Sequence, residues 1–357
     1  MQTPLPIRDY PKPWAHTWTG RGTARKQRGL SLSELMVGSA LGMVLVVAMV
    51  GLVLQQRQAT RNIDALARIQ EGSRFAFELM TRDGRMAGMN PCGTHITANA
   101  IRPSPWWADT DAGTVRAFGP KEDSAGIIGF GKGSADRING TAAVVLLGPV
   151  TTEDDILRVT GHRAGANRFE MAGVGDLKPN DVIQVCDGTS AALLQVTAID
   201  TTNNWVNYSA TGLNCSDLLG EINSSCSYKT AKTFASGASI VRWEPTFWYI
   251  GNSPLGSPSL YRARLENKSG ALLTIPEEIA PDVRDLQVSV LTRDTTRGNA
   301  LATTWVAPGS MAGNWVDPAA EVSALQISFT LSPTASTGAP PLQRTLVALV
   351  IPRARNP

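Results

Sequence analysis

The chain of 357 residues has a net charge of +3, with 43% hydrophobic and only 18% charged residues, a balance typical of globular proteins. The charge is uneven: residues 1–29 contain six basic residues against one acid and carry +5, which leaves −2 for the remainder. No basic run or basic-aromatic cluster follows residue 29, which argues against a nucleic-acid-binding protein. The 33 Gly and 22 Pro indicate many turns and favour strands over a helical bundle.

A long apolar run follows the basic stretch. Residues 35–54 (LMVGSALGMVLVVAMVGLVL) are 20 consecutive residues without a charge, and a helix of that length spans the roughly 30 Å hydrocarbon layer of a bilayer. The positive-inside rule predicts a cytoplasmic N-terminus and an external remainder. A secretory signal peptide would have a shorter apolar core followed by small residues, whereas Gln55-Gln56-Arg57-Gln58 comes next.

Glu34 stands at the edge of this run, and a plain signal anchor does not explain it. Burying an unpaired carboxylate costs several kcal/mol, so we expect Glu34 to have a specific partner. The surrounding stretch, KQRGLSLSELMV at residues 26–37, resembles the cleavage-methylation motif of type IV prepilins. The resemblance implies that a prepilin peptidase cuts between Gly29 and Leu30. Leu30 then becomes the N-methylated first residue, where the family more often has phenylalanine, and Glu34 becomes the fifth.

The same resemblance implies how subunits associate. Apolar pilin helices form a parallel bundle, in which the Glu34 carboxylate of one subunit pairs with the Leu30 amine of a neighbour. Because both charges lie in a low-dielectric core, this pairing sets register more than it adds stability.

The helix is expected to continue beyond the apolar run, over residues 31–87. Gly88 and Pro91 supply a stop signal, and no proline precedes them after Leu30. The second half is expected to pack an apolar stripe against the rest of the protein, formed by Ile63, Leu66, Ile69, Ala76, Leu79, Met80 and Met86. The predicted domains are a cleaved leader (1–29), the pilin helix (30–90; transmembrane 35–54, amphipathic 55–88) and a head (91–357).

Beyond Pro91, short apolar runs alternate with turn residues, which is typical of strands. No internal repeat or long linker interrupts them, so we expect one β-rich head and an α+β fold overall. The predicted strands are residues 142–147, 181–185, 192–199, 205–209, 239–243, 246–250, 286–291, 325–331 and 345–351.

The four cysteines all follow the apolar run, and their spacing does not suit zinc. In an exported head, an even number of cysteines favours two disulfides over free thiols. Three pairings are possible and the sequence does not choose between them. We favour Cys215 with Cys226, which closes a short loop, and Cys92 with Cys186, which ties the end of the helix to a strand.

A second resemblance covers most of the chain and is to the PilW family of minor pilins. It rests on several loose motifs and on their order along the chain. These are residues 66–76 and 80–88 with the cysteine at 92, NDVIQVCD at 180–187, ALLQVT at 192–197, SLYR at 259–262, EEI at 277–279, VRDLQV at 283–288 and the closing strand 345–353.

We expect no enzymatic activity, cofactor or metal. The histidines His16, His95 and His162 are scattered, and GFGKG at 129–133 lacks the Lys-Ser/Thr that follows in a P-loop. The segment 106–113 (WWADTDAG) lacks the later Glu of a calcium loop, so a solvated turn is the better interpretation. Its two tryptophans fit core packing at least as well as partner binding, and residues 152–155 (TEDD) are interpreted as a surface acidic patch.

The resemblance implies a minor pilin that initiates type IV pilus assembly in a complex near the fibre tip. Its partners would be other minor pilins, the major pilin, the prepilin peptidase and the inner-membrane assembly platform, and nucleic acid is not expected among them. It would lie in the inner membrane before assembly and in the pilus afterwards. The alternatives are a minor pseudopilin of a type II secretion system, a DNA-binding competence pseudopilin, and a membrane-anchored periplasmic adhesin or enzyme.

Overall fold

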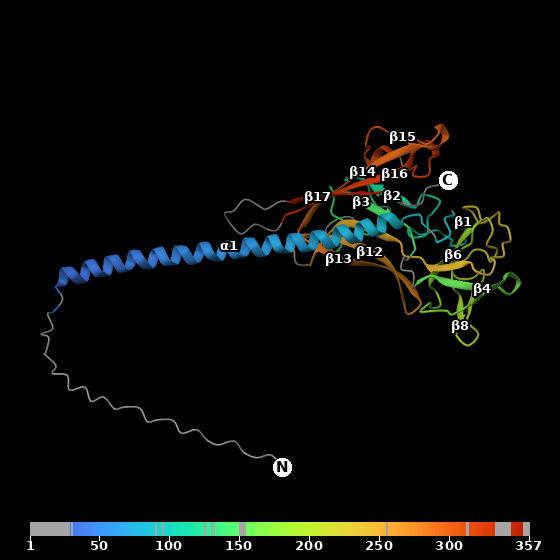
Figure 1. Cartoon of the computed structure of the whole chain (residues 1–357), viewed down its shortest axis with the longest axis horizontal. Helices are drawn as coiled ribbons and strands as arrows, with labels where there is room; N and C mark the ends of the chain where they lie inside the picture. The colour runs from blue at the N-terminus through green and yellow to red at the C-terminus, as the bar shows by residue number, and fades with distance from the viewer. Residues whose placement is uncertain are drawn as a thin grey trace, which may run out of the picture. The chain divides into compact units, whose positions relative to one another are not determined.

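The computed structural model describes residue 29 and residues 31–89, 91–94, 96–124, 126–129, 131, 133–149, 155–254, 256–311, 314–332 and 344–352. It divides into two compact units, Met1–Arg61 and Asn62–Pro357, which are described separately below. The first holds the apolar half of the helix α1 (Leu32–Met86), and the second holds its remaining half and every strand (Figure 1).

Local signals set both ends of α1. Ser31 precedes the first helical residue, and its carbonyl accepts the first helical bond from the Leu35 N–H at 3.1 Å. At the other end Gly88 has φ +73°, a left-handed conformation that ends a helix at little cost in glycine. The predicted helix, residues 31–87, therefore differs from the observed one by a single residue at each end.

Three sheets make up the β-rich part of the second unit, in strand orders β1-β7-β6-β10-β4-β5-β9-β8, β13-β12-β11-β3-β2 and β15-β14-β16-β17. The first sheet contains β1 (Ile96–Asn99), β4 (Leu157–Arg163), β5 (Arg168–Met171), β6 (Val182–Cys186), β7 (Ala191–Gln195), β8 (Ala198–Asp200), β9 (Trp205–Asn207) and β10 (Ser239–Arg242). The second contains β2 (Val115–Phe118), β3 (Ala143–Leu146), β11 (Thr246–Asn252), β12 (Pro258–Lys268) and β13 (Ala271–Pro281). The third contains β14 (Val283–Asp294), β15 (Ala300–Leu301), β16 (Glu321–Leu331) and β17 (Arg344–Val350). The 3₁₀ turns with described bounds are η2 (Ala164–Ala166), η3 (Thr295–Arg297), η4 (Pro308–Met311) and η5 (Pro318–Ala320).

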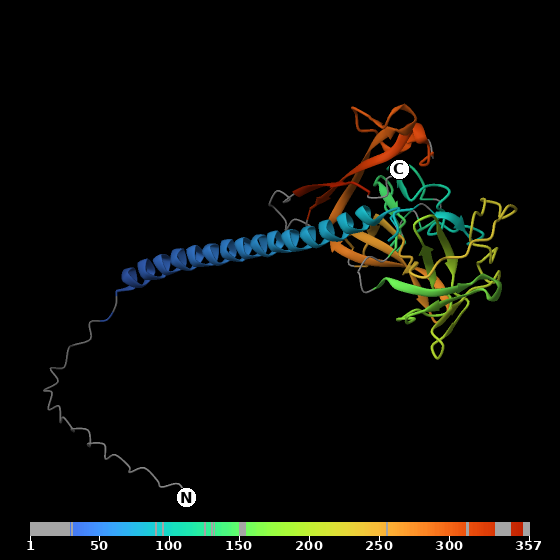
Figure 2. The same ribbon diagram turned by 45° about the vertical axis from the view of Figure 1, so that its right-hand side comes forward.

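The strands β3 and β11 of the five-stranded sheet are buried on both faces. On one face, Val144, Trp248 and Leu260 join a core cluster with the end of α1 and the four-stranded sheet, which Figure 2 shows in orange and red. On the other, Val145 and Tyr249 belong to a second cluster shared with the eight-stranded sheet. Alternate residues of β3, β11 and β12 therefore serve different cores, which explains the nearly continuous apolar sequences of β3 and β11.

The coarse prediction of an α+β protein with one long N-terminal helix and a β-rich domain is confirmed. A single strand over 192–199 is wrong, because β7 ends at Gln195 and β8 begins at Ala198. Between them the chain changes partners: the Val196 N–H donates to Asp181, and the Thr197 N–H donates to Asn207. The strands β1, β2, β4, β5, β12, β13 and β15 were not predicted.

Candidate functional site

The first candidate site is the start of α1, where Ser31 and Glu34 form a capping box. The Glu34 Oε2 accepts hydrogen bonds from the Ser31 N–H at 3.0 Å and from the Ser31 hydroxyl at 3.1 Å. In return the Glu34 N–H donates to the Ser31 Oγ at 3.2 Å. This reciprocal arrangement gives acceptors to the backbone N–H groups of Ser31 and Glu34, which have no acceptor within the helix. Glu34 therefore has a local partner, and its position does not by itself require a second subunit.

The predicted processing residues, Gly29 and Leu30, directly precede this capping box. Gly29 is exposed, and an added Cβ would meet nothing within 4 Å. Leu30 and residues 1–28 of the predicted leader lie outside the described residues, so the expected cleavage and methylation remain predictions.

Residues Leu32–Arg61 of α1 are long and apolar enough, by length and composition, to cross a membrane. Large apolar side chains are exposed throughout this part, from Leu35 (62%) to Leu54 (60%). The first half of α1 is therefore a candidate membrane anchor, in agreement with the predicted segment 35–54.

The second half of α1 buries one stripe in the core of the second unit. The stripe is spaced by steps of three or four residues, and it contains Ile69, Ser73, Ala76, Met80, Gly84 and Ala87. The predicted stripe is wrong at its start, because Ile63 and Leu66 are 65% and 41% exposed. In the described structure, burial of this face begins at Ile69.

A buried ion pair fixes the last turn of this helix to the five-stranded sheet. The Asp83 Oδ2 accepts from the Arg262 Nε at 2.7 Å and from the Trp248 Nε1 at 3.0 Å, while the Oδ1 accepts from the Arg262 Nη2 at 2.9 Å. Trp248 and Arg262 are directly opposite each other on β11 and β12. The pair joins two of the motifs on which the PilW resemblance rests, residues 80–88 and 259–262.

The four cysteines form two disulfides with the favoured pairing. Cys92, which follows α1, is bonded to Cys186 at the end of β6, and Cys215 is bonded to Cys226 across an interval of 11 residues. The first bond also joins two segments that carry the PilW resemblance, the end of the helix and residues 180–187.

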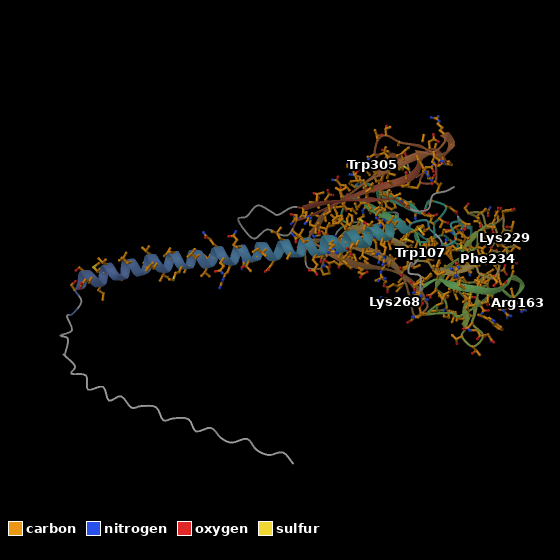
Figure 3. The ribbon with its side chains drawn as sticks, in the orientation of Figure 1. Trp107, Arg163, Lys229, Phe234, Lys268 and Trp305 are labelled. Atoms are coloured by element: carbon orange, nitrogen blue, oxygen red, sulfur yellow. A yellow bond between two sulfur atoms is a disulfide. The ribbon has the colours of Figure 1, made fainter. Side chains whose placement is uncertain are left out.

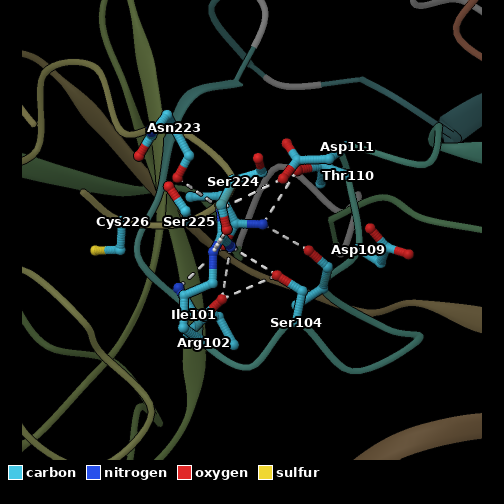
Figure 4. A network of polar contacts seen from close by, with 12 residues as sticks. Ile101, Arg102, Ser104, Asp109, Thr110, Asp111, Asn223, Ser224, Ser225 and Cys226 are labelled. Carbon is cyan, nitrogen blue, oxygen red and sulfur yellow. Dashed lines mark hydrogen bonds and ion pairs between the residues drawn. The ribbon is translucent and has the colours of Figure 1, made fainter. Parts of the chain in front are cut away.

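Arg102 donates to two carbonyls of the loop closed by Cys215 and Cys226 (Figure 4). The Arg102 Nε donates to the Ser224 carbonyl at 2.6 Å, and its Nη2 donates to the Asn223 carbonyl at 3.1 Å and to Asp111 at 3.3 Å. Asn223 and Ser224 are themselves exposed. The disulfide and Arg102 therefore both tie the exposed part of this loop to the rest of the domain.

Two expectations for the segment 106–113 can be compared with its contacts. Trp107, labelled in Figure 3, is 6% exposed and its carbonyl accepts from the Trp243 Nε1, in agreement with core packing. Asp109 forms an ion pair with Arg116 at 3.2 Å, and Asp111 forms one with Arg102. Among the described residues, no group of three or more His, Cys, Asp or Glu side chains is placed to hold a metal ion.

The glycine-rich segment 129–133 has an internal acceptor. The Gly133 N–H donates to the Asp136 Oδ2 at 2.7 Å, so this amide of the loop already has a carboxylate of the same chain as its acceptor. Phe130 and Lys132 of this segment lie outside the described residues, as do residues 152–154 of the predicted acidic patch.

His162 belongs to a partly buried aromatic cluster. Its Nδ1 accepts from the Phe234 N–H at 2.9 Å, and its ring stacks on Phe169 with centroids 4.5 Å apart. The Nε2 lies 2.5 Å from the Tyr208 hydroxyl, and it carries the proton of the neutral ring because Nδ1 is an acceptor. Burial lowers the pKa of His162 to about 4 and raises that of Tyr208.

The fold and these contacts define an α+β protein with one candidate membrane helix, two disulfides and a β-rich domain built on the end of that helix. The chain has no significant match among protein-family models, curated proteins or solved structures.

Proposed function

We propose that this protein is a minor pilin of the PilW type, which takes part in initiating type IV pilus assembly. One observation carries the proposal: Gly29 stands five residues before Glu34, at the start of an apolar helix whose other end is built into a disulfide-bonded, β-rich domain. The membrane helix would bundle with the helices of other pilins, and the domain would present surfaces to neighbouring subunits.

Two contacts support the narrower assignment within pilin-like proteins. The Asp83–Arg262 pair and the Cys92–Cys186 bond each connect segments whose order along the chain carries the resemblance. After cleavage by a prepilin peptidase, the protein would move from the inner membrane, with its head in the periplasm, into a complex at the pilus tip.

The capping box allows the roles of Glu34 to be separated. Glutamine also serves at this position of a capping box, so Glu34→Gln keeps the cap and removes the charge. Ser31→Ala removes the cap and keeps the charge. If the Glu34 charge acts between subunits, Glu34→Gln will block incorporation into pili, whereas Ser31→Ala will not. Equal defects in both variants would limit Glu34 to helix capping.

Processing is tested on the purified protein by mass spectrometry of its N-terminus. We expect a methylated Leu30 in the native chain and an uncut leader in Gly29→Val. An uncut native N-terminus would contradict the proposal and favour a membrane-anchored adhesin or enzyme.

The cellular role is tested with an in-frame deletion, scored for surface pili, twitching and secretion of exported enzymes. We expect loss of pili with secretion intact. Loss of secretion with normal pili would assign the protein to a type II secretion system instead.

A further inference from the structure

The strand β17 is an unprotected edge of the four-stranded sheet. It pairs with β16 on one side, and no described strand pairs with its other side. Exposed edges are usually blunted with charges or proline. The edge strand β13 follows this rule, with Pro276, Glu277 and Glu278. Residues 345–350 of β17 (TLVALV) contain no charge, proline or glycine.

The outer face of β17 is apolar, in contrast to its neighbour. Val347, Leu349 and the following Ile351 are 54%, 55% and 47% exposed. Directly opposite on β16, Val347 faces Ser328 and Leu349 faces Gln326. The apolar row is therefore confined to the edge strand, where an added strand would cover it.

A hollow in the surface lies on the helix α1, which packs against β17. Gly84 of α1 is packed against Val350 of β17, and Figures 1 and 2 both show β17 beside the helix. Thr81 is three residues earlier, so its side chain lies about 60° further round the helix. It lines a hollow of about 360 Å³ with Phe77, Glu78, Arg82, Arg85 and Met86.

One residue of the lining, Thr81, has a buried hydroxyl without a partner in the described part of the chain. Thr81 is 7% exposed, and its Oγ1 bonds to no group in the described part of the chain. A buried hydroxyl without a hydrogen bond is costly, so this wall of the hollow is a local weak point in the packing of α1.

The rim of the hollow is cationic. Arg85 is exposed and forms no ion pair within the described ranges, and Arg82 approaches only Asp83, at 3.9 Å. The one acid in the lining, Glu78, is already paired with Arg74 at 3.1 Å. A second copy of β17 would bring more arginine to this rim, which disfavours self-pairing.

We propose that β17 and this hollow form a docking site for an extended segment of a partner protein, in which apolar residues alternate with acidic residues. Side chains of an added strand point alternately to the two faces of the sheet. Apolar residues on the outer face would cover Val347 and Leu349, and acidic residues on the inner face would meet Arg82 and Arg85. The backbone of the segment would pair with the free edge. This proposal does not depend on the assignment as a pilin.

The test uses the full chain in detergent micelles and three fluorescent peptides with the 7 residues of β17 as their length. One peptide alternates valine with glutamate, the second alternates valine with lysine, and the third is the glutamate peptide with a central proline. Binding is followed by fluorescence anisotropy at low salt. We expect saturable binding of the glutamate peptide and affinities at least about tenfold weaker for the other two.

Two variants locate the binding. Leu349→Asp should weaken the glutamate peptide at least about tenfold, since it places an acid in the apolar row. Leu273→Asp, at a 43% exposed position on the edge strand β13, is the matched control and should leave binding unchanged. The proposal is overturned if the glutamate peptide does not bind, if the lysine peptide binds equally, or if Leu349→Asp has no effect. It is also overturned if the chain dimerises through β17, detected as a dimer that Leu349→Asp converts to a monomer.

Discussion

Asp83 and Arg262 form a two-point ion pair with side chains only 6% and 7% exposed, between positions 179 residues apart. The same carboxylate accepts the indole N–H of Trp248, so three donors converge on one acid. Because both charges are buried, the pair is costly to break from one side: removing Asp83 leaves a guanidinium in the core.

Asp83→Ala is expected to lower the free energy of unfolding by roughly 3–5 kcal/mol. Urea unfolding of the full chain in detergent, followed by tryptophan fluorescence, measures this change. The control is Glu78→Gln on the same helix, which breaks the exposed Arg74–Glu78 pair and should cost less than about 0.5 kcal/mol. Similar losses in the two variants would contradict the special role of the buried pair.

Two helical glycines are expected to respond in opposite directions to alanine. At Gly84 an added Cβ would overlap the Val350 side chain, and at Gly72 it would lie 3.7 Å from the Ala280 Cβ, an ordinary contact. Alanine gains up to about 1 kcal/mol in helix propensity, whereas overpacking costs about 1–3 kcal/mol. Gly72→Ala should therefore stabilise the protein and Gly84→Ala destabilise it, as measured by the midpoint of urea unfolding. A stabilising Gly84→Ala would show that β17 moves aside freely.

Acid should weaken the fold through His162. Its folded pKa of about 4 lies below the usual value near 6.5. The unfolded state therefore binds more protons between these values, and stability is present above pH 6.5 and lost as the pH falls towards 4. We expect a loss on the order of 2 kcal/mol, less than the full shift would give because His162 is partly exposed to solvent.

The variant His162→Gln tests this pH dependence. Glutamine can accept from the Phe234 N–H and donate to Tyr208, yet does not titrate. Urea unfolding between pH 4 and 7 should show a flatter pH dependence in the variant. Parallel curves for the two proteins would assign the acid sensitivity to other groups.

The two disulfides should contribute unequally. Their cysteines are 94 and 11 residues apart, and the loop-entropy estimate is about 4–5 kcal/mol for the Cys92–Cys186 bond and about 3 kcal/mol for the Cys215–Cys226 bond. Paired Cys→Ser variants of each bond, compared by urea unfolding, measure the difference. If removing the Cys215–Cys226 bond lowers the free energy of unfolding more than removing the Cys92–Cys186 bond, the loop-entropy estimate is wrong. The contacts of the loop that Arg102 binds would then contribute more to stability than the length of the closed loop does.

The helix could be predicted almost to the residue, because its signals are local: an uninterrupted apolar and amphipathic pattern ending at Gly88. The spacing of Ser31 three residues before Glu34 is a further local signal, and it predicts a capping box. Glu34 was instead interpreted only as evidence for a specific partner. The long hairpin of β12 and β13 was not predicted, because Arg264, Glu266 and Glu277 interrupt its apolar pattern.

The contacts that join distant segments could not be predicted in the same way. Nothing near Asp83 in the sequence indicates Arg262, since only the packing of α1 on two paired strands brings them together. Nor does the periodicity of the helix show where burial begins, because Ile63 and Leu66 share the pattern of the buried stripe and remain exposed.

The Cys92–Cys186 bond also determines how the chain would carry a mechanical load. A pull on α1 reaches residue 92 and passes through the bond to β6 whenever the opposing force acts after Cys186. Once the contacts of α1 with the sheets have given way, residues 93–185, which contain β1 to β5 and most of β6, lie in a loop that the bond bypasses and bear no tension along the covalent path. Almost half of the strands between the helix and β12 could therefore vary in sequence without weakening the path along which force is transmitted.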